Sequence, residues 1–229
     1  MNSSVIDAHN VSKVYMEGSV STYALNNVHL HIERGEFIAI KGPSGSGKTT
    51  LLNMIGGLDI PTSGYVEIDG TNITELSSNE LVTFRLHNIG FVFQSYNLIP
   101  VLTAEENIEF IMLLQNVSDS ERQHRVHELL KEIGLEDKAK KKPSELSGGQ
   151  QQRIAVARAL ASKPQFILAD EPTANLDSKS AGNLLDIMLK LNKEEHMTFI
   201  FSTHDQRVID RARRVITLED GKIVSDIQQ

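Results

Sequence analysis

The sequence predicts an α/β fold in which a mostly parallel sheet is covered by helices and interrupted by a helical insertion. Beyond Pro164, short apolar runs alternate with amphipathic segments in the order strand, helix, strand, helix, strand, which is typical of a parallel sheet with helices on its faces. Near residue 40 a buried strand, a glycine-rich loop and a helix follow one another. Between about residues 95 and 160, apolar residues recur every three or four positions, which indicates helices.

The first 60 residues are expected to form strands that lead into a loop and a helix. Residues 24–32 alternate between apolar and polar side chains, as a half-buried strand does. Residues 37–40 form a short apolar run between turn residues, which suits a buried strand. The expected elements are strands over Val5–Ala8, Ala24–Ile32 and Phe37–Ile40, a turn over Glu33–Glu36 and a helix over Thr49–Gly57.

The rest of the chain supplies the helical insertion and then the alternating elements. Helices are expected over Ala104–Leu114, Glu121–Ile133 and Gln151–Ser162, with Gly134 as the C-terminal cap of the second. The later elements are strands over Phe166–Ala169, Thr198–Ser202 and Val215–Leu218, and helices over Ser180–Leu191 and Gln206–Ala212. Residues 1–229 then form a single domain, with an α/β core over 1–93 and 163–229 and a helical part over about 94–162.

The composition argues against several classes of protein. A chain of 229 residues with 40% hydrophobic residues is long and apolar enough for a core. The 23 basic and 30 acidic residues give a net charge of −7, which disfavours broad binding to nucleic acid. Without cysteine, disulfides and thiolate metal sites are excluded. Residues 1–10 carry no apolar signal core, and no apolar run approaches the roughly 20 residues of a membrane span. The chain is expected to be soluble and cytoplasmic.

The glycine-rich loop fits the pattern G-x-x-x-x-G-K-[ST] between a strand and a helix. Its glycines let backbone N–H groups wrap around phosphate, and the helix that follows adds partial positive charge at its N-terminus. We expect Lys48 to reach the β- and γ-phosphates and the Thr49 hydroxyl to bind Mg²⁺. The alternative is a glycine-rich turn that binds nothing. The expected nucleotide contacts are Gly42, Pro43, Ser44, Gly45, Ser46, Gly47, Lys48, Thr49 and Thr50.

Two carboxylates follow the apolar strand that begins at Phe166. Side chains at the C-terminal end of such a strand project into the crevice where parallel sheets bind ligands. Asp170 is expected to hold Mg²⁺, and Glu171 to accept a proton from an attacking water. An isolated acidic pair is more often a solvated strand end, but the phosphate loop upstream favours the functional interpretation.

A second candidate anion site lies at Leu146–Gln150, which reads Leu-Ser-Gly-Gly-Gln before a long helical stretch. The Ser147 hydroxyl and the N–H groups at a helix start can all point at one phosphate. The alternative is a plain helix cap. These five letters match the signature of the ATP-binding subunits of ABC transporters, and the order of motifs resembles that family along nearly the whole chain. The other matching positions are Tyr15 before the loop, Gln94 after the strand Gly90–Phe93, Asp177 in Ala174–Asp177, and His204.

The resemblance implies a P-loop NTPase core of RecA-like type, an N-terminal antiparallel β-subdomain and an inserted helical subdomain. It also implies that two copies, or this chain and a related subunit, meet head to tail around two ATP molecules. Ser147, Gly148, Gly149 and Gln150 of one copy would close over ATP held by the other, and Asp177 would cross the interface. The implied catalytic residues are Glu171, His204, Gln94 and Lys48; the implied Mg²⁺ ligands are Thr49, Gln94 and Asp170; and Tyr15 would stack on adenine.

The resemblance further implies a separate transmembrane permease, which would dock in a groove of the helical region, Phe93 to about Lys142. Ile89–Gln94, Asn97–Pro100, Leu102–Ala104 and Asn107 most resemble the ATPases of the macrolide-export and lipoprotein-releasing type. The chain would then be peripheral on the inner face of the cell membrane and would touch it only through the permease. For the basic run Lys138–Lys142, contact with anionic lipid and a solvated loop face are both open, and the solvated face is favoured.

Other members of the family suggest competing functions. DNA-repair members carry long coiled coils or cysteine zinc modules, and translation factors carry two cassettes, whereas this sequence has neither feature. A cell-division ATPase that signals through a membrane partner without moving cargo remains an alternative, and the neighbouring permease gene would discriminate. A module that binds nucleotide without hydrolysis is a further alternative, against which Glu171 argues.

Overall fold

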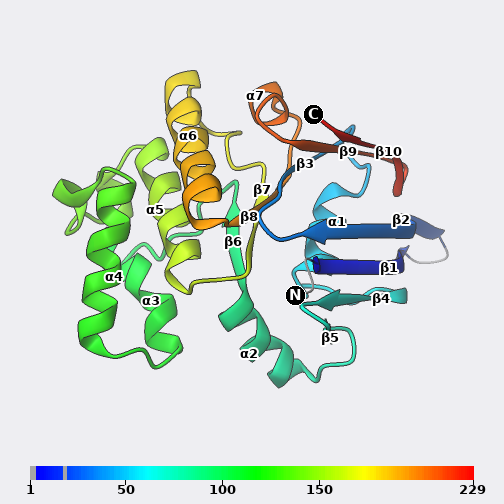
Figure 1. Ribbon diagram of the computed structural model, residues 1–229, viewed down its shortest axis with the longest axis horizontal. Helices are drawn as coiled ribbons and strands as arrows, with labels where there is room; N and C mark the ends of the chain where they lie inside the picture. The colour runs from blue at the N-terminus through cyan, green and yellow to red at the C-terminus, as the bar shows by residue number, and fades with distance from the viewer. Residues whose placement is uncertain (1–3, 18–19) are drawn as a thin grey trace.

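The computed structural model describes residues 4–17 and 20–229, which fold into two sheets and a group of helices (Figure 1). One sheet is four-stranded with the order β2-β1-β4-β5, and the other is six-stranded with the order β10-β9-β3-β8-β7-β6. The strands are β1 Ser4–Glu17, β2 Val20–Glu33, β3 Phe37–Lys41, β4 Ser63–Ile68, β5 Thr71–Asn72, β6 Ile89–Phe93, β7 Phe166–Asp170, β8 Thr198–Ser202, β9 Arg214–Glu219 and β10 Lys222–Gln228. The α-helices are α1 Lys48–Ile55, α2 Ser78–Asn88, α3 Ala104–Leu114, α4 Asp119–Glu132, α5 Gly148–Ala161, α6 Ser178–Glu195 and α7 Gln206–Ile209.

The six-stranded sheet is parallel except for its edge strand β10. Strands β9, β3, β8, β7 and β6 run in the same direction, and β10 pairs with β9 antiparallel. The register aligns the strand ends, because Phe93 pairs with Asp170 and Asp170 with Ser202. The loops after β3, β6, β7 and β8 therefore leave from one edge of the sheet, which is where open parallel sheets bind ligands.

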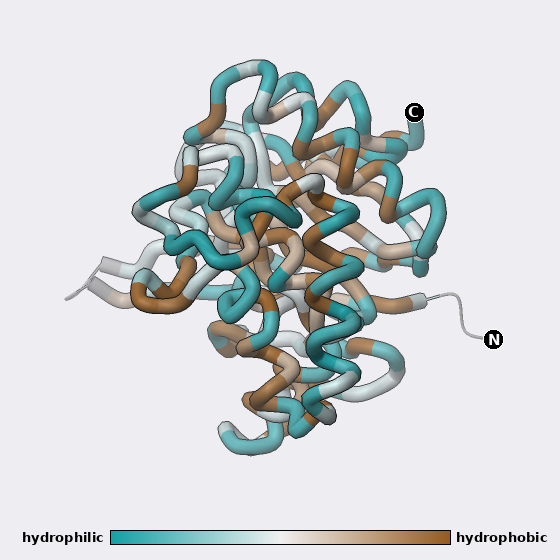
Figure 2. The backbone as a smooth tube through the Cα atoms, turned by 90° about the vertical axis from the view of Figure 1, so that its left-hand side faces the viewer, coloured by the Kyte–Doolittle hydropathy of each residue, from teal (hydrophilic) through white to brown (hydrophobic). Residues whose placement is uncertain are grey.

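Hydrophobic residues pack on both faces of this sheet. Along β3, Phe37 and Ala39 belong to the core on the side of α3–α6, whereas Ile38 and Ile40 belong to the core shared with α1, β1, β2 and β4. This alternation follows from the two-residue period of a strand. Figure 2 shows the apolar residues gathered inside the molecule and hydrophilic residues on many of its outer turns.

The helical segment packs on the same core as the sheet. Buried residues of α3, α4 and α5 share one cluster with α6 and with one face of the sheet. Helix α3 begins after Thr103, whose side chain forms a capping box with Glu106, and α4 begins after the cap Ser118. Gly134 follows α4 with φ 63°, as expected for a C-terminal cap. In the figure this segment lies farthest from the antiparallel sheet (Figure 1).

The predicted fold class is confirmed, with local corrections. Strands β4, β5 and β10 and helix α2 were not predicted. In α2 only Leu81 is buried, so the helix has little apolar periodicity, and its sequence signal is the capping box from Ser77 to Glu80. Strand β10 lies at the sheet edge with Val224 and Ile227 exposed. Helix α5 begins three residues before the predicted start, at Gly148, because Ser147 caps it.

Two further sequence expectations concern the C-terminal region and the surface. Helix α7 ends at Ile209 rather than Ala212, because the chain turns there to begin β9 at Arg214. In the predicted basic run, Lys140 pairs with Glu105 and Lys141 with Glu145 at the surface. Among residues 4–17 and 20–229, no helix is both long enough and apolar enough to span a membrane.

Candidate functional site

The glycine-rich loop between β3 and α1 forms the floor of a cavity of about 680 Å³. Segments from both sheets line it, including the loops after β3, β6, β7 and β8. The lining residues are Thr22, Tyr23, Ala24, Gly42, Pro43, Ser44, Gly45, Gly47, Lys48, Thr49, Thr50, Gln94, Glu171, Ser202 and His204. Most of the loop residues expected to contact nucleotide are among them. Ser46 is not, because its side chain is buried.

The loop backbone requires glycine where it passes β2. Gly47 has φ 100°, and a Cβ there would lie 2.2 Å from the carbonyl oxygen of Ala24. Gly47 is also the cap of α1 and offers no side-chain hydrogen bond to the helix. The first N–H groups of α1 are therefore left for an anion. The Lys48 ammonium lies over the loop and donates to the carbonyl oxygens of Gly42 and Pro43, each at 2.9 Å.

Thr49 and Asp170 meet at the side of the cavity. The Thr49 hydroxyl donates to the Asp170 carboxylate, with Oγ1–Oδ2 at 3.1 Å. Hydroxyl and carboxylate oxygens are ligands that Mg²⁺ prefers. Within residues 4–17 and 20–229, no three His, Cys, Asp or Glu side chains are grouped to hold a metal ion. A cation here would take its other ligands from amide, water and phosphate oxygens, which is the usual pattern in nucleotide sites.

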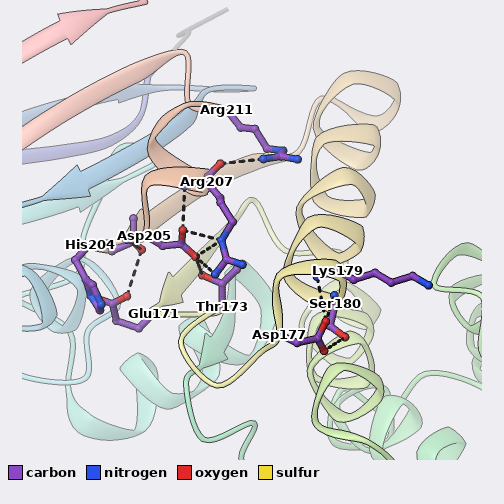
Figure 3. Close-up of polar contacts among 10 residues, drawn as sticks. Glu171, Thr173, Asp177, Lys179, Ser180, His204, Asp205, Arg207 and Arg211 are labelled. Atoms are coloured by element: carbon purple, nitrogen blue, oxygen red, sulfur yellow. Dashed lines mark hydrogen bonds and ion pairs between the residues drawn. The ribbon is translucent and has the colours of Figure 1, made fainter.

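Glu171 directs its carboxylate toward His204 (Figure 3). Its Oε1 lies 2.6 Å from His204 Nδ1, and its Oε2 accepts a hydrogen bond from Thr203 Oγ1 at 3.2 Å. The backbone of Glu171 has φ 46°, which is unusual for a residue with a side chain and often marks a functional site. Its N–H donates to the carbonyl oxygen of Ser202 at 2.9 Å, which helps to hold this conformation.

Asp205, which the sequence did not single out, joins the two loops of the site. Its carboxylate accepts hydrogen bonds from Thr173 Oγ1 at 2.6 Å and from the Arg207 guanidinium at 2.7–3.0 Å (Figure 3). The bonds from Arg207, and then that from Thr173, outweigh the effect of burial and lower the pKa of Asp205 to about 2. Because Thr173 belongs to the loop after Glu171, this ion pair ties that loop to the one carrying His204.

The loop that carries Gln94 is held by polar side chains from α5 and from the segment before α6. Asn175 donates to the carbonyl oxygen of Gln94 at 3.1 Å. Arg158 on α5 donates to the carbonyl oxygens of Tyr96 and Asn97, at 3.0 and 2.6 Å. Burial lowers the pKa of Arg158. The position of Gln94 at the cavity is therefore linked to the helix that begins with the Ser-Gly-Gly motif.

The Ser-Gly-Gly motif does not line the cavity of its own chain. Ser147 caps α5 and forms a capping box with Gln150. A Cβ at Gly149 would lie 2.8 Å from the side chain of Ser180, so glycine permits the close contact between the starts of α5 and α6. Asp177 caps α6 by accepting bonds from the N–H groups of Lys179 and Ser180 and from the Ser180 hydroxyl (Figure 3).

The paired strands β1 and β2 supply further residues at or beside the cavity. Tyr15 on β1 pairs with Thr22 on β2, and Thr22 and Tyr23 line the cavity. Tyr15 itself is exposed, and its hydroxyl donates to Asp59 at 2.9 Å. The sequence did not predict the lining role of Thr22, Tyr23, Ala24 and Ser202. Only the pairing of β1 with β2 and the register of β8 could have indicated it.

Comparisons with known proteins agree with the motifs. A family model described as "ABC transporter" matches residues 25–174. The chain is 47% identical over 225 residues to the macrolide export ATP-binding/permease protein MacB of Mannheimia succiniciproducens. The match covers 98% of this chain and 35% of that protein, so the chain spans about a third of its length. It is 49% identical over 223 residues to the ABC transporter ATP-binding protein MJ0796 of Methanocaldococcus jannaschii, covering 96% of this chain and 95% of that one.

Solved structures give the same result. The dimeric structure of the cassette MJ0796 in a post-hydrolysis state with ADP and Pi has a TM-score of 0.90 and 47% identity, covering 97% of this chain and 98% of that chain. The structure of cbiO1 from Clostridium perfringens has a TM-score of 0.88 and 28% identity, covering 99% and 89%. Motifs, fold and relatives therefore agree, and the chain belongs to the ABC transporter family, as an ATP-binding cassette.

Proposed function

We propose that this chain binds and hydrolyses ATP in the cavity above the glycine-rich loop, and that hydrolysis drives a separate membrane-spanning permease. The observation that carries this proposal is that the loop, Gln94, Glu171 and His204 line one cavity of about 680 Å³. The relative MJ0796, solved with ADP and Pi bound, supports hydrolysis at such a site.

The phosphates bind where the chain offers positive charge. The uncapped N-terminus of α1 presents N–H groups, and the Lys48 ammonium exchanges its two backbone carbonyl partners for phosphate oxygens. Thr49, Asp170 and Gln94 are the residues that would hold Mg²⁺, which supplies charge neutralisation on the phosphates when bound. All of these side chains come from loops and ends at one edge of the parallel sheet.

Glu171 acts as the general base for the attacking water. The water oxygen forms a bond to the γ-phosphorus while the bond from that phosphorus to the oxygen of ADP breaks, and the carboxylate takes the proton. His204 lies 2.6 Å from Glu171 and is largely exposed toward the cavity. From this position His204 donates to the γ-phosphate and keeps Glu171 aimed at the water.

Two copies form the working unit. The motif Leu146–Gln150 lies outside the cavity of its own chain, so its helix end is available to the ATP of a second copy. Such a head-to-tail pair closes under two-fold symmetry, and Asp177 lies beside the motif, at the start of α6. The relative MJ0796 was solved as a dimer, which supports this arrangement.

The permease docks on the helical segment. Val101, Phe110, Leu113 and Leu114 are exposed large apolar residues in or next to α3, and exposed apolar groups of this kind are typical of protein contacts. The MacB relatives are ATP-binding/permease proteins by name, which supports a permease partner of the macrolide-export or lipoprotein-releasing type. The chain then lies on the inner face of the membrane and touches it only through that permease.

A variant with Glu171→Gln tests both hydrolysis and pairing. We expect its ATPase rate to fall about 100- to 10,000-fold, because a positioned base is lost. ATP should still bind, and size-exclusion chromatography should show ATP-dependent dimers, because the phosphates remain intact. Glu194→Gln, at an exposed pair with Lys190, is the matched control and should turn over ATP normally. Unchanged hydrolysis in Glu171→Gln would contradict the role of the base, and the absence of ATP-dependent dimers would contradict the pairing.

A further inference from the structure

Tyr15 lies next to two residues that line the phosphate cavity. Its strand partner Thr22 lines the cavity, as does Thr50, whose hydroxyl interacts with the Tyr15 phenol. Tyr15 is 43% exposed. An exposed, flat aromatic side chain beside a triphosphate site is suited to stack on a nucleobase, since every base presents a π-face. Fixing the orientation of the ring before the base arrives lowers the entropic cost of stacking.

Two charged residues fix this ring. The Tyr15 hydroxyl donates to Asp59 Oδ2 at 2.9 Å, and the Lys13 ammonium donates to Asp59 Oδ1 at 2.7 Å. Lys13 also donates to the carbonyl oxygen of Ile60 at 2.7 Å, and the N–H of Ile60 donates to Asp59 at 2.7 Å. The ammonium lies over the Tyr15 ring, 5.1 Å from its centroid, within the range of a cation–π contact. Asp59 therefore holds both the phenol and the cation that covers one ring face.

The protonation states suit this arrangement. Burial raises the pKa of Asp59, but the hydrogen bonds from Lys13, Tyr15 and Ile60 together outweigh it and leave the pKa below its usual value. Burial and then the bond to Asp59 raise the pKa of the Tyr15 phenol. At neutral pH the carboxylate is thus charged and the phenol is protonated, so the bond from Tyr15 to Asp59 is formed with its donor on the phenol.

We propose that Lys13 and Asp59 are positioning residues that hold Tyr15 as a platform for the base of a purine nucleoside triphosphate. Lys13 occupies one face of the ring, and the base stacks on the opposite face. This inference rests on the proposed nucleotide site. Stacking reads the face of a base and not its edges, so the platform strengthens binding of ATP and GTP alike and contributes nothing to inorganic tripolyphosphate.

The test compares Asp59→Ala and Lys13→Met with the wild-type chain. Affinities for ATP and GTP are measured by isothermal titration, and that for tripolyphosphate by displacement of a fluorescent ATP analogue. We expect both variants to bind either nucleotide about three- to tenfold more weakly, since part of the stacking energy is lost. Tripolyphosphate affinity should stay unchanged. In turnover, the KM for ATP should rise by the same factor while kcat stays near the wild-type value.

A double-variant cycle separates positioning from general damage. In a Tyr15→Leu background there is no ring to orient, so adding Asp59→Ala should not weaken ATP binding further. Tyr15→Phe keeps the ring but loses the bond to Asp59, and should weaken ATP binding less than Tyr15→Leu does. Asp69→Ala removes an exposed carboxylate paired with Arg34 elsewhere on the surface and serves as the matched control. Thermal unfolding of each variant checks that it is folded.

Three outcomes would overturn the inference. They are unchanged ATP affinity in Asp59→Ala, an equal loss for ATP and tripolyphosphate, and an undiminished effect of Asp59→Ala when Tyr15 is already leucine. Failure of the proposed function looks different, because the wild-type chain would then bind no ATP at all. A wild-type chain that binds ATP, with additive effects of Asp59 and Tyr15, would refute the platform and leave the nucleotide site in place.

Discussion

Glu171 combines an unusual backbone conformation with a paired side chain. Its φ of 46° is held by the bond from its N–H to Ser202, and its carboxylate is shared between His204 and Thr203. The left-handed conformation turns the chain out of β7, so that the side chain after Asp170 reaches the cavity. At the residue scale, a few hydrogen bonds to the end of the neighbouring strand β8 therefore set the position of Glu171. Single substitutions can test the roles of individual residues in the site.

Replacing Lys48 by alanine should abolish most nucleotide binding. The ammonium is a charged donor at the cavity floor, and bonds of this type contribute about 1.5–3 kcal/mol, which corresponds to roughly a tenfold or greater loss of affinity. Titration with a fluorescent ATP analogue measures the effect. Lys190→Ala, on an exposed face of α6, should bind the analogue as the wild type does. Unchanged affinity in Lys48→Ala would refute the assigned role.

Gly47→Ala should destabilise the fold as well as the site. The residue has φ 100°, and the new Cβ would lie 2.2 Å from the Ala24 carbonyl oxygen, so we expect a loss of about 1–3 kcal/mol in the free energy of unfolding. Gly182 in α6 is the matched control, because a Cβ there meets nothing within 4 Å. Gly182→Ala should stabilise the protein by about 0.5–1 kcal/mol. Urea unfolding distinguishes the two, and equal effects would contradict the close approach of loop and strand.

At the scale of elements, the loops of the site are tied to one another by side chains rather than by strand pairing. Asp205 and Thr173 join the loops after β8 and β7, and Arg158 joins α5 to the loop after β6. Asp205 also caps α7 by accepting from the N–H of Arg207. Asn175, in the segment after β7, also donates to the Gln94 carbonyl oxygen in the loop after β6. Together these contacts connect the three loops and bond α5 to the loop that carries Gln94.

The ion pair of Asp205 with Arg207 should make the free energy of unfolding depend on pH. The pKa of Asp205 in the folded protein, about 2, is lower than the ordinary value of 3.8. The carboxylate therefore contributes fully to the free energy of unfolding above about pH 5, and this contribution is lost as the pH falls toward 2. We expect the wild type to lose on the order of 1–2 kcal/mol more than Asp205→Asn between pH 5 and pH 2, as measured by urea unfolding. Asp186→Asn, at an exposed side chain, should behave as the wild type. If the free energy of unfolding depended on pH in the same way for the wild type and Asp205→Asn, the ion pair would be contradicted.

At the scale of the whole molecule, the cavity and the Ser-Gly-Gly helix end are separate features, because residues 146–150 are not among those that line the cavity. The cavity opens at the carboxyl ends of β3, β6, β7 and β8, whereas Ser147 caps α5 in the helical segment. Under the proposed function, each chain would supply two half-sites that do not meet within that chain. Pairing head to tail would unite them, and a mixing experiment can detect it without a structure.

Two inactive variants should complement each other. Lys48→Ala disables the phosphate loop, and Ser147→Arg disables the helix end. In a head-to-tail dimer of the two variants, one site takes the altered loop and the altered helix end. The other site takes the intact loop and the intact helix end. In a random mixture about half of the dimers are mixed, so ATPase activity should return to roughly a quarter of the wild-type value. A mixture of Lys48→Ala with Glu171→Gln is the control. Both residues belong to the cavity of their own chain, so each site of the mixed dimer carries one defect and ATPase activity should not return. Activity in the control but not in the first mixture would contradict the head-to-tail arrangement.

The strongest sequence predictions were those that depended on local pattern. The limits of α3 at Ala104 and Leu114 were predicted correctly, because a cap and regular apolar spacing mark them. Helix α2 was missed since it buries only Leu81, and β10 since it is an edge strand without a clean alternation. For the site, the phosphate loop could be read from its letters. The lining by Thr22 and Tyr23 could not, because it depends on how β1 and β2 pair.

The sequence by itself determined the chemistry of this protein: a phosphate loop, two carboxylates after a strand, and a capped helix start. These depend on residue type and on backbone preferences set within a few positions. Only the tertiary structure decided which groups meet, because the deciding contacts join distant segments. Glu171 and His204 are 33 positions apart, Arg158 and Asn97 are 61, and Asn175 and Gln94 are 81. The packing of the sheet and the register of its strands bring these residues within bonding distance, and no local pattern encodes that.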